Sequence, residues 1–442
     1  MKAIKFAIAI ALIAAVVHAE DRFDKTFSRS LTYKGGRVTV ENRFGDVKIH
    51  TGHGNNVVLR ATIRSSDSEI GRSINIEMTE GAGGITIKTV VPSIHKHGSL
   101  SFSIDEDLTV PDEAPLYVTN HFGSIDAAGL RAASELVSRQ GSIVLRDSAG
   151  RQRLESAFGS ITVEHANGDI DATSSNGSIT ARNVDGKLAA TNRFGSINVS
   201  GVKGDVAATN ANGSVDVHDV GGSAALANGF GSTRFSNIGR NLAVTSKNGR
   251  IDGKGVGGTA TVTGSFDTIE LKDIGGATRI SNGNGSVTVS DVRGSLSVET
   301  RFGQVRAERV HGSLTVSNAN GSVTASDVAG DAHVKASFGS VFLKGIDGAV
   351  NVQNQNGGIS LTGLRGSCHP VTLHTSFSSI KVAVPPKTGY NVDVRTTFGS
   401  INAEVPINAA RRSEDTLTGT INSGGCKMEL VTANGGVTIA AE

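Results

Sequence analysis

Residues 159–176 read GSITVEHANGDIDATSSN, and the same 18-residue template recurs without insertion from Phe122 to Asn356. With Gly159 counted as position 1, position 3 is Ile or Val in thirteen of fourteen units, and position 10 is Gly in twelve of fourteen. A fixed short period indicates that each unit stacks on the next instead of folding alone. The residue at position 18, which closes each unit, alternates between Phe and Asn with one exception: Phe122, Gln140, Phe158, Asn176, Phe194, Asn212, Phe230, Asn248, Phe266, Asn284, Phe302, Asn320, Phe338 and Asn356.

The pattern inside one unit predicts two short strands. Apolar residues stand at positions 3 and 5, then 8, then 12 and 14, which is largely the period-2 alternation of β-strands. The Gly at position 10 and the Asn-Gly or Phe-Gly junction predict turns, because Gly and Asn adopt positive φ at little steric cost. No segment after residue 20 carries the 3.6-residue apolar period of a helix. We therefore expect an all-β fold, a single-chain β-solenoid with irregular end caps.

The alternation of Phe and Asn leaves two coil lengths open, one repeat unit or two. In an 18-residue coil, a large and a small side chain alternate in one column, which relieves crowding at a corner. In a 36-residue coil, Phe stacks on Phe and Asn on Asn, as in the side-chain ladders of stacked strands. We expect the 18-residue coil, because its interior is narrow enough for Ile and Val to fill.

Composition agrees with a thin solenoid and excludes some partners. The chain has 442 residues, but a solenoid grows by adding coils, so this length does not imply several domains. There are 56 Gly, 4% aromatic residues and no Trp, which suits a narrow coil with tight turns. The formal charge of +2 is too balanced to suggest a nucleic acid or an anionic membrane as partner.

The first 19 residues resemble a secretory signal peptide. Lys2 and Lys5 precede an apolar run over residues 6–17, and residues 17–19 read VHA, a small-residue cleavage pattern. A membrane anchor is the alternative, although the run is short for a bilayer. We expect an exported protein that is periplasmic, on the outer surface or secreted, with no transmembrane segment after signal removal.

The rest of the chain divides into three predicted parts. Residues 20–121 have a looser rhythm and predict an N-terminal strand-rich cap with the first coils, and residues 122–364 predict the regular solenoid. Residues 365–442 predict irregular C-terminal coils and a cap, since the spacing stretches and prolines such as Pro385 and Pro406 interrupt it.

Cys368 and Cys426 are the only cysteines. In an exported chain an even number of cysteines favours a disulfide, which here would span a separation of 58 residues. Two small unpaired thiols without a role are the alternative.

Four stretches near the C-terminus carry a resemblance to a known family. They are residues 382–392 (VAVPPKTGYNV), 396–401 (TTFGSI), 417–425 (LTGTINSGG) and 430–439 (LVTANGGVTI). Together they are similar to the bacterial adhesin-like β-strand-repeat family of unknown function, which is allied to auto-transporter adhesin head domains. The resemblance covers most of the mature chain and implies a β-solenoid of exported or envelope proteins. It implies no catalytic residues.

The search for chemistry yields two weak candidates. Asp273 and Asp291 at position 7 could share a Ca²⁺ ion, although Asx and Gly are also what a turn requires. Asp169 and Asp171 are the nearest pair of carboxylates for a glycan-cleaving β-helix enzyme, but stacked basic neighbours such as Arg151 favour a solvated ion-pair ladder. No nucleophile elbow, paired-His motif or phosphate loop is present. We expect no catalytic, cofactor-binding or metal residues, and no cofactor.

A Ser column at position 2 could bind ice or glycans, but charged residues interrupt the column beside it, which favours a solvated polar face. The sequence thus predicts a non-catalytic β-solenoid that acts as an adhesin-like or scaffold surface. Its expected partner is a protein or glycan of the cell envelope and not a nucleic acid. Two alternatives stay open, a carbohydrate-active β-helix enzyme and a structural protein that assembles end to end.

Overall fold

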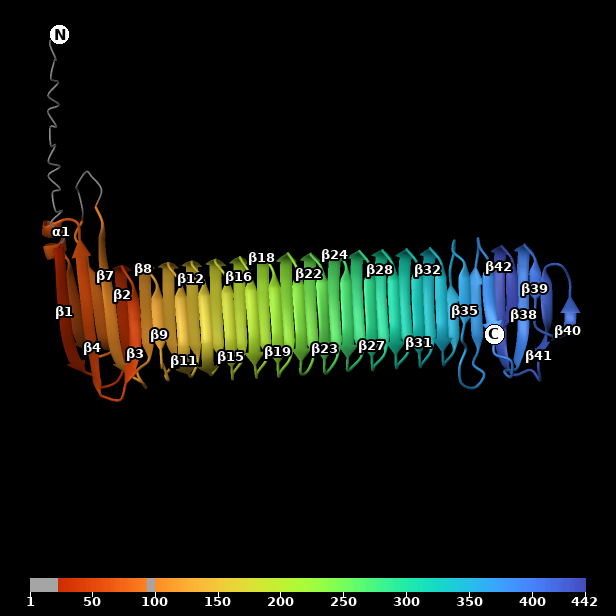
Figure 1. Ribbon diagram of the computed structural model, residues 1–442, viewed down its shortest axis with the longest axis horizontal. Helices are drawn as coiled ribbons and strands as arrows, with labels where there is room; N and C mark the ends of the chain where they lie inside the picture. The colour runs from red at the N-terminus through yellow and green to blue at the C-terminus, as the bar shows by residue number, and fades with distance from the viewer. Residues whose placement is uncertain (1–22, 94–99) are drawn as a thin grey trace, which may run out of the picture.

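The computed structural model describes residues 23–93 and 100–442, so the predicted signal peptide lies outside the described residues. The described chain forms a long rod built almost entirely of strands stacked along its axis (Figure 1). This confirms the predicted β-solenoid. The one helix of the described residues, α1, spans six residues, Ser68–Ser73, and no helix there has the length and apolarity to cross a bilayer.

Each regular coil contributes one strand to each of two parallel sheets, which we call sheet A and sheet B. In sheet A, Ile161 lies opposite Ile179, and in sheet B, Ile170 lies opposite Leu188. In both pairs the partners are one 18-residue repeat apart. One repeat therefore makes one coil, as predicted, and the alternative of a 36-residue coil is wrong.

The strand bounds follow the 18-residue period along the rod. In sheet A the regular strands are β9 (Ile125–Ala128), β11 (Ile143–Ala149), β13 (Ile161–Asn167), β15 (Ile179–Val184), β17 (Ile197–Val202), β19 (Val215–Val220), β21 (Thr233–Ile238), β23 (Ile251–Val256), β25 (Ile269–Ile274), β27 (Val287–Val292), β29 (Val305–Val310), β31 (Val323–Val328), β33 (Val341–Ile346) and β35 (Ile359–Thr362). In sheet B they are β8 (Leu116–Phe122), β10 (Ser134–Gln140), β12 (Gln152–Phe158), β14 (Ile170–Asn176), β16 (Leu188–Phe194), β18 (Val206–Asn212), β20 (Ala224–Phe230), β22 (Leu242–Asn248), β24 (Ala260–Phe266), β26 (Thr278–Asn284), β28 (Leu296–Phe302), β30 (Leu314–Asn320), β32 (Ala332–Phe338) and β34 (Val350–Gln353).

The core is an aliphatic column between the two sheets. Positions 3 and 5 of sheet A and positions 12 and 14 of sheet B are buried, as at Ile197, Val199, Val206 and Ala208. Position 7 is left-handed, with φ of 56° at Asp219, and this bend also turns position 8 inward. The Asx and Gly residues at position 7 are therefore explained by the backbone conformation that the coil requires.

A polar side chain at position 16 holds the turn from sheet B to sheet A. Asn192 is buried, and its Nδ2 donates to the carbonyl of Gly177 at 2.8 Å, the position-1 Gly of the same turn one coil earlier. Asn210 repeats the bond to Gly195 at 2.9 Å. These bonds satisfy carbonyls that the tight turn would otherwise leave unpaired.

Antiparallel strands cover the N-terminal end of the rod. In sheet A, β1 (Phe23–Thr32) pairs with β4 (Asn56–Ser65), β4 with β7 (Phe102–Pro111), and β7 with β3 (Val47–Gly52), which lies beside the first regular strand. In sheet B, β5 (Asn75–Gly81) and β6 (Gly84–Val90) form a hairpin that pairs with β2 (Arg37–Phe44). The outermost strand β1 is mostly exposed and carries charges, which discourages pairing with another sheet edge.

The C-terminal end is irregular. Its strands are β36 (Val371–Thr375), β37 (Ile380–Val384), β38 (Tyr390–Phe398), β39 (Ile401–Ala403), β40 (Ile407–Arg412), β41 (Thr416–Ile421), β42 (Cys426–Asn434) and β43 (Val437–Ala441). In sheet B, β42 pairs with both β36 and β38, and β38 and β40 both pair antiparallel with β41. A disulfide joins Cys368, just before β36, to Cys426 at the start of β42, with the Cα atoms 5.7 Å apart.

Candidate interaction surface

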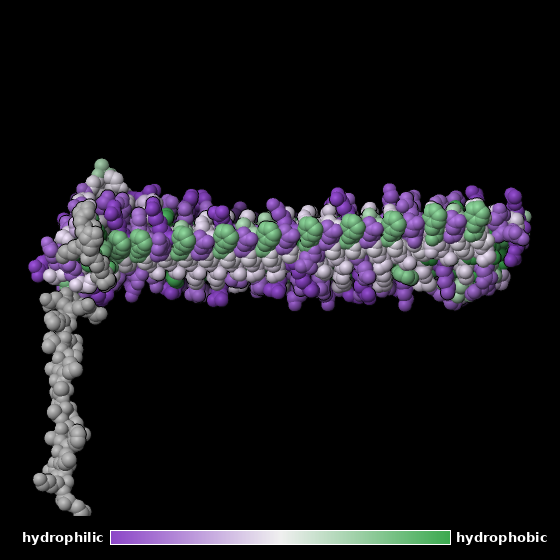
Figure 2. Space-filling view, turned by 90° about the horizontal axis from the view of Figure 1, so that it is seen from above, coloured by the Kyte–Doolittle hydropathy of each residue, from purple (hydrophilic) through white to green (hydrophobic). Residues whose placement is uncertain are grey.

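A row of exposed phenylalanines follows one corner of the rod. The seven Phe residues that close alternate coils are each 43–58% exposed, and we call them the Phe row: Phe122, Phe158, Phe194, Phe230, Phe266, Phe302 and Phe338. Figure 2 shows a line of separated apolar side chains that runs along the length of the rod between hydrophilic neighbours. The sequence shows the alternation of these residues, but only the structure shows that the rings lie outside.

The turn that follows explains why these rings stay outside. Position 16 is the last inward side chain of the sheet B strand, and position 1 of the next unit has positive φ in most coils, as at Gly213 with 127° and at Asp267 with 92°. A Cβ atom on Gly213 would lie 2.1 Å from the carbonyl oxygen of Gly195, so the turns of neighbouring coils are in close contact. Position 18 stands directly before this corner, where the strand alternation ends, and its side chain remains at the surface.

Phe and Asn occupy one column along this corner. Asn176 lies opposite Phe158 on one side and Phe194 on the other. Successive rings of the Phe row are therefore two coils apart, roughly 9.6 Å.

Crowding alone does not explain why Phe occurs only in every second coil. Phe44 and Phe122 occupy neighbouring coils at the N-terminal end, and their rings stack with centroids 5.1 Å apart and an interplanar angle of 3°. Adjacent rings are thus compatible with the fold, and Asn at the same position is compatible with it too. Folding therefore accounts for the corner but not for the alternation.

A flat face of small side chains adjoins the Phe row on sheet B. Across β16 to β24 the outward residues at positions 13 and 15 carry no charge: Ala189, Thr191, Ala207, Thr209, Ala225, Ala227, Ala243, Thr245, Thr261 and Thr263. Our sequence analysis considered only the Ser column at position 2 and missed this face. The sequence pattern that could have revealed this face is the repeated small outward residue in segments such as LAATN at 188–192 and VAATN at 206–210.

The carboxylates that the sequence singled out lie beside this face. Asp169, Asp171 and Lys187 line a shallow depression of about 550 Å³ at its N-terminal end. The Oδ1 atom of Asp169 accepts a hydrogen bond from the backbone N–H of Lys187 at 2.9 Å, and Asp205, two coils further along, accepts the same bond from Ser223. Asp169 thus ties one turn to the next.

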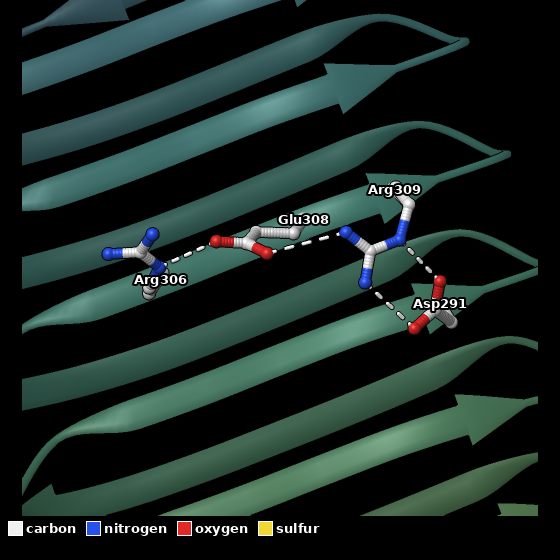
Figure 3. A network of polar contacts seen from close by, with 4 residues as sticks. All are labelled: Asp291, Arg306, Glu308 and Arg309. Carbon is white, nitrogen blue, oxygen red and sulfur yellow. Dashed lines mark hydrogen bonds and ion pairs between the residues drawn. The ribbon is translucent and has the colours of Figure 1, made fainter.

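The Asp column at position 7 carries ion pairs. Asp273 and Asp291 have φ of 58° and 61°, in agreement with their interpretation as turn residues. Arg309 Nε and Nη2 donate to the two carboxylate oxygens of Asp291 at 2.5 and 2.9 Å, and Glu308 links Arg309 to Arg306 (Figure 3). These hydrogen bonds from Arg309 lower the pKa of Asp291 to about 2.

The guanidinium of Arg309 occupies the carboxylate oxygens that a calcium ion would need. Within the described residues, no group of three or more His, Cys, Asp or Glu side chains is placed to hold a metal ion.

A buried carboxyl in the N-terminal cap escaped the sequence analysis. Glu106 in β7 is 2% exposed, and burial raises its pKa to about 7. The Oγ1 atom of Thr89 lies 2.9 Å from Oε1 of Glu106 and 3.1 Å from Oδ1 of Asn42. A hydroxyl has one proton for these two acceptors, so a protonated Glu106 supplies the second donor that the cluster lacks.

The fold is thus a parallel two-sheet β-solenoid with an exposed apolar row. Comparison with known proteins shows that part of the chain is similar to a protein family. Residues 232–440 match the family model described as Toastrack DUF4097. This agrees with the resemblance to an adhesin-like family of unknown function, while the link to auto-transporter adhesin head domains stays a prediction. A solved structure titled "putative cell adhesion protein" from Clostridium sporogenes aligns with 95% of this chain and 100% of its own at 8% identity. Its TM-score of 0.20 is too low to support an argument. No curated protein matches the chain.

Proposed function

We propose that this protein is an exported, non-catalytic scaffold with an adhesin-like surface, and that the Phe row forms its centre of interaction with a protein or glycan of the cell envelope. The observation that supports this is the exposure of seven Phe side chains in a column where Asn serves the fold equally well.

The apolar area argues for an interaction surface. A Phe side chain presents about 200 Å² when fully exposed, so seven half-exposed rings present about 700 Å². The area is divided among separate rings, but their alignment along one corner sets them apart from singly scattered apolar residues and favours a site that binds a partner. Covering it would contribute binding free energy in proportion to the area removed from water.

Two observations favour the scaffold over the enzyme and over end-to-end assembly. Asp169, from the carboxylate pair that the sequence offered for glycan cleavage, accepts from a backbone N–H, and Asp291, from the pair offered for calcium, is bound by Arg309. Antiparallel strands end both sheets at the N-terminus and sheet B at the C-terminus, and the parallel edge that remains there in sheet A is the three-residue strand β39.

The proposal is tested by removing the rings without disturbing the coil. The variant combines Phe194→Asn, Phe230→Asn, Phe266→Asn and Phe302→Asn, which installs the residue that neighbouring coils already carry at this position. We expect unchanged circular dichroism, and a loss of at least about tenfold in cross-linked partners captured from envelope fractions of the native host.

Phe342→Thr is the matched control. Phe342 is also an exposed phenylalanine, but it lies on sheet A between Thr324 and Ser360. Capture that is lost with Phe342→Thr and retained by the fourfold variant would contradict the assignment of the Phe row.

A further inference from the structure

We propose that the Phe row docks onto the Phe row of a second copy of this chain, with the two rods side by side and antiparallel. The inference rests on the proposed function, because it takes the Phe row as the interaction surface and names its occupant. It leaves the Ala and Thr face of sheet B as a separate surface.

The first argument is the order of Phe and Asn in the column of position-18 residues, which close the coils. The column has fourteen regular positions, begins with Phe122 and ends with Asn356. When a second copy is reversed and fully overlapped, every Phe faces a smaller polar side chain, since Phe122 meets Asn356 and Phe230 meets Asn248. The one irregular position also fits, because Gln140 meets Phe338. Large side chains therefore stand opposite small ones along the whole contact.

The parallel arrangement lacks this complementarity. A twofold axis along the rods places each residue of the position-18 column opposite its own copy, so Phe would meet Phe and Asn would meet Asn in every coil. A twofold axis perpendicular to the rods closes the dimer with the same patch on both chains and without a mismatch.

The second argument is charge. Four of the position-17 residues that flank the regular column are Lys or Arg, and none there is Asp or Glu. In the parallel arrangement the two position-17 columns lie on opposite sides of the twofold axis, with equivalent cations at the same height along the rods. In the antiparallel one, Arg139, Arg193, Lys247 and Arg301 meet Ser337, Gly283, Gly229 and Ser175, respectively. The reversed pairing thus places a small neutral residue opposite each cation and avoids like-charge contacts.

The third argument is the size and period of the surface. About 700 Å² of exposed Phe surface per chain approaches the roughly 800 Å² that each partner buries in a stable interface. A partner that fills the space over every Asn must present a large side chain every two coils. The Phe row of a second copy has this spacing.

A bilayer or a glycan could instead cover the Phe row. Both differ from a second copy in how binding would respond to added Phe residues. Insertion of rings into an anionic bilayer, or stacking of sugars on them, would gain from additional Phe residues. The antiparallel dimer would lose from them, because an added ring fills the space that receives the partner's ring.

The experiment measures the mass of the full mature chain by sedimentation equilibrium. We expect a dimer for the natural sequence and for Phe342→Thr, and a monomer for the fourfold Phe→Asn variant, with association weaker by roughly 100-fold or more. We also expect Asn212→Phe combined with Asn248→Phe to weaken the dimer although it adds apolar surface. Circular dichroism checks that each variant is folded.

A cysteine experiment tests the orientation. Chains with Phe122→Cys are mixed with chains with Asn356→Cys under mild oxidation. We expect mixed disulfides between the two variants, because position 122 of one chain faces position 356 of the other. Homotypic disulfides from each variant alone would overturn the antiparallel arrangement.

The outcomes separate this inference from the proposed function. A monomeric natural chain that still captures an envelope partner through its Phe row, or binds anionic vesicles or glycans better with the two Asn→Phe changes, overturns the dimer and leaves the proposed function in place. If the fourfold variant changes neither self-association nor capture, both proposals are wrong.

Discussion

Asn210 and Asn212 are two residues apart, yet their side chains have different structural roles. Asn210 is buried and donates to the carbonyl of Gly195, so it is part of the turn. Asn212 is only partly buried, and the coils on both sides place Phe at its position. The same residue type thus supports the fold at position 16 and occupies a variable surface site at position 18.

Glu106 makes the stability of the N-terminal cap depend on pH. Its pKa is raised from an ordinary value of 4.5 to about 7, so the folded cap favours the protonated carboxyl. This contribution is fully present below pH 4.5 and is lost as the pH rises through about 7, by up to about 3 kcal/mol. We expect Glu106→Gln to remove that dependence and to be the more stable form at pH 8.

The measurement is urea unfolding of both proteins at pH 5 and pH 8, followed by circular dichroism. The difference between the two proteins isolates Glu106 from the other titrating groups. Equal differences at the two pH values would contradict the raised pKa.

Gly213 tests the contact between turns. A Cβ at this position would lie 2.1 Å from the carbonyl oxygen of Gly195, and its φ of 127° is unfavourable for any L side chain. We expect Gly213→Ala to destabilise the protein by about 2 kcal/mol or more, because neither the backbone nor the neighbouring turn can yield. Gly54→Ala is the control, since nothing lies within 4 Å of its added Cβ. Equal thermal midpoints for the two variants would argue against close contact between turns.

At the level of elements, the irregular C-terminal strands depend on a covalent link. The Cys368–Cys426 disulfide spans 58 residues and ties the chain before β36 to β42, which lies between β36 and β38. Such a link stabilises chiefly by restricting the unfolded chain, by roughly 4 kcal/mol for a loop of this length. We expect the double variant Cys368→Ser with Cys426→Ser to lose that stability in the C-terminal coils.

Hydrogen exchange distinguishes a local effect from a global one. Faster exchange in β42 with unchanged exchange in β18 is the expected result, because a solenoid coil contacts only its neighbours. Unchanged exchange in β42 would mean that packing alone holds these strands.

At the scale of the whole molecule, the rod should tolerate removal of complete coils. Deleting residues 213–248 removes two coils and joins Asn212 to Gly249, so register, turn and alternation are all retained. We expect a folded rod that small-angle scattering shows to be shorter by roughly 10 Å.

Deleting residues 213–239 removes one and a half coils and is the matched control. It shifts the following residues by half a repeat, so that Ser246 falls at the left-handed position 7 and Lys247 at the inward position 8. We expect this chain to misfold locally, whereas equal behaviour of the two deletions would contradict the 18-residue coil.

The local features of the fold were predictable from the sequence, because they depend on residues close together in the chain. Alternation at positions 3, 5, 12 and 14 determines the strands, and Gly or Asx at positions 1, 7 and 10 determines the turns. The stacking of identical units then follows, since one coil cannot bury its own apolar face. From the sequence, packing favoured the 18-residue coil over the 36-residue coil. The register between neighbouring strands showed that the coil has 18 residues.

The surface needed the tertiary structure. Period-2 alternation would turn position 18 inward, and only the position of the corner shows that the Phe rings lie outside in one column. The Glu106 cluster joins Asn42, Thr89 and Glu106 from three separate strands, a contact that no local pattern reveals. The repeat in the sequence thus determined which residues build each coil. The stacking of the coils decided which side chains remain for a partner, because exposure depends on neighbours that are distant in the chain.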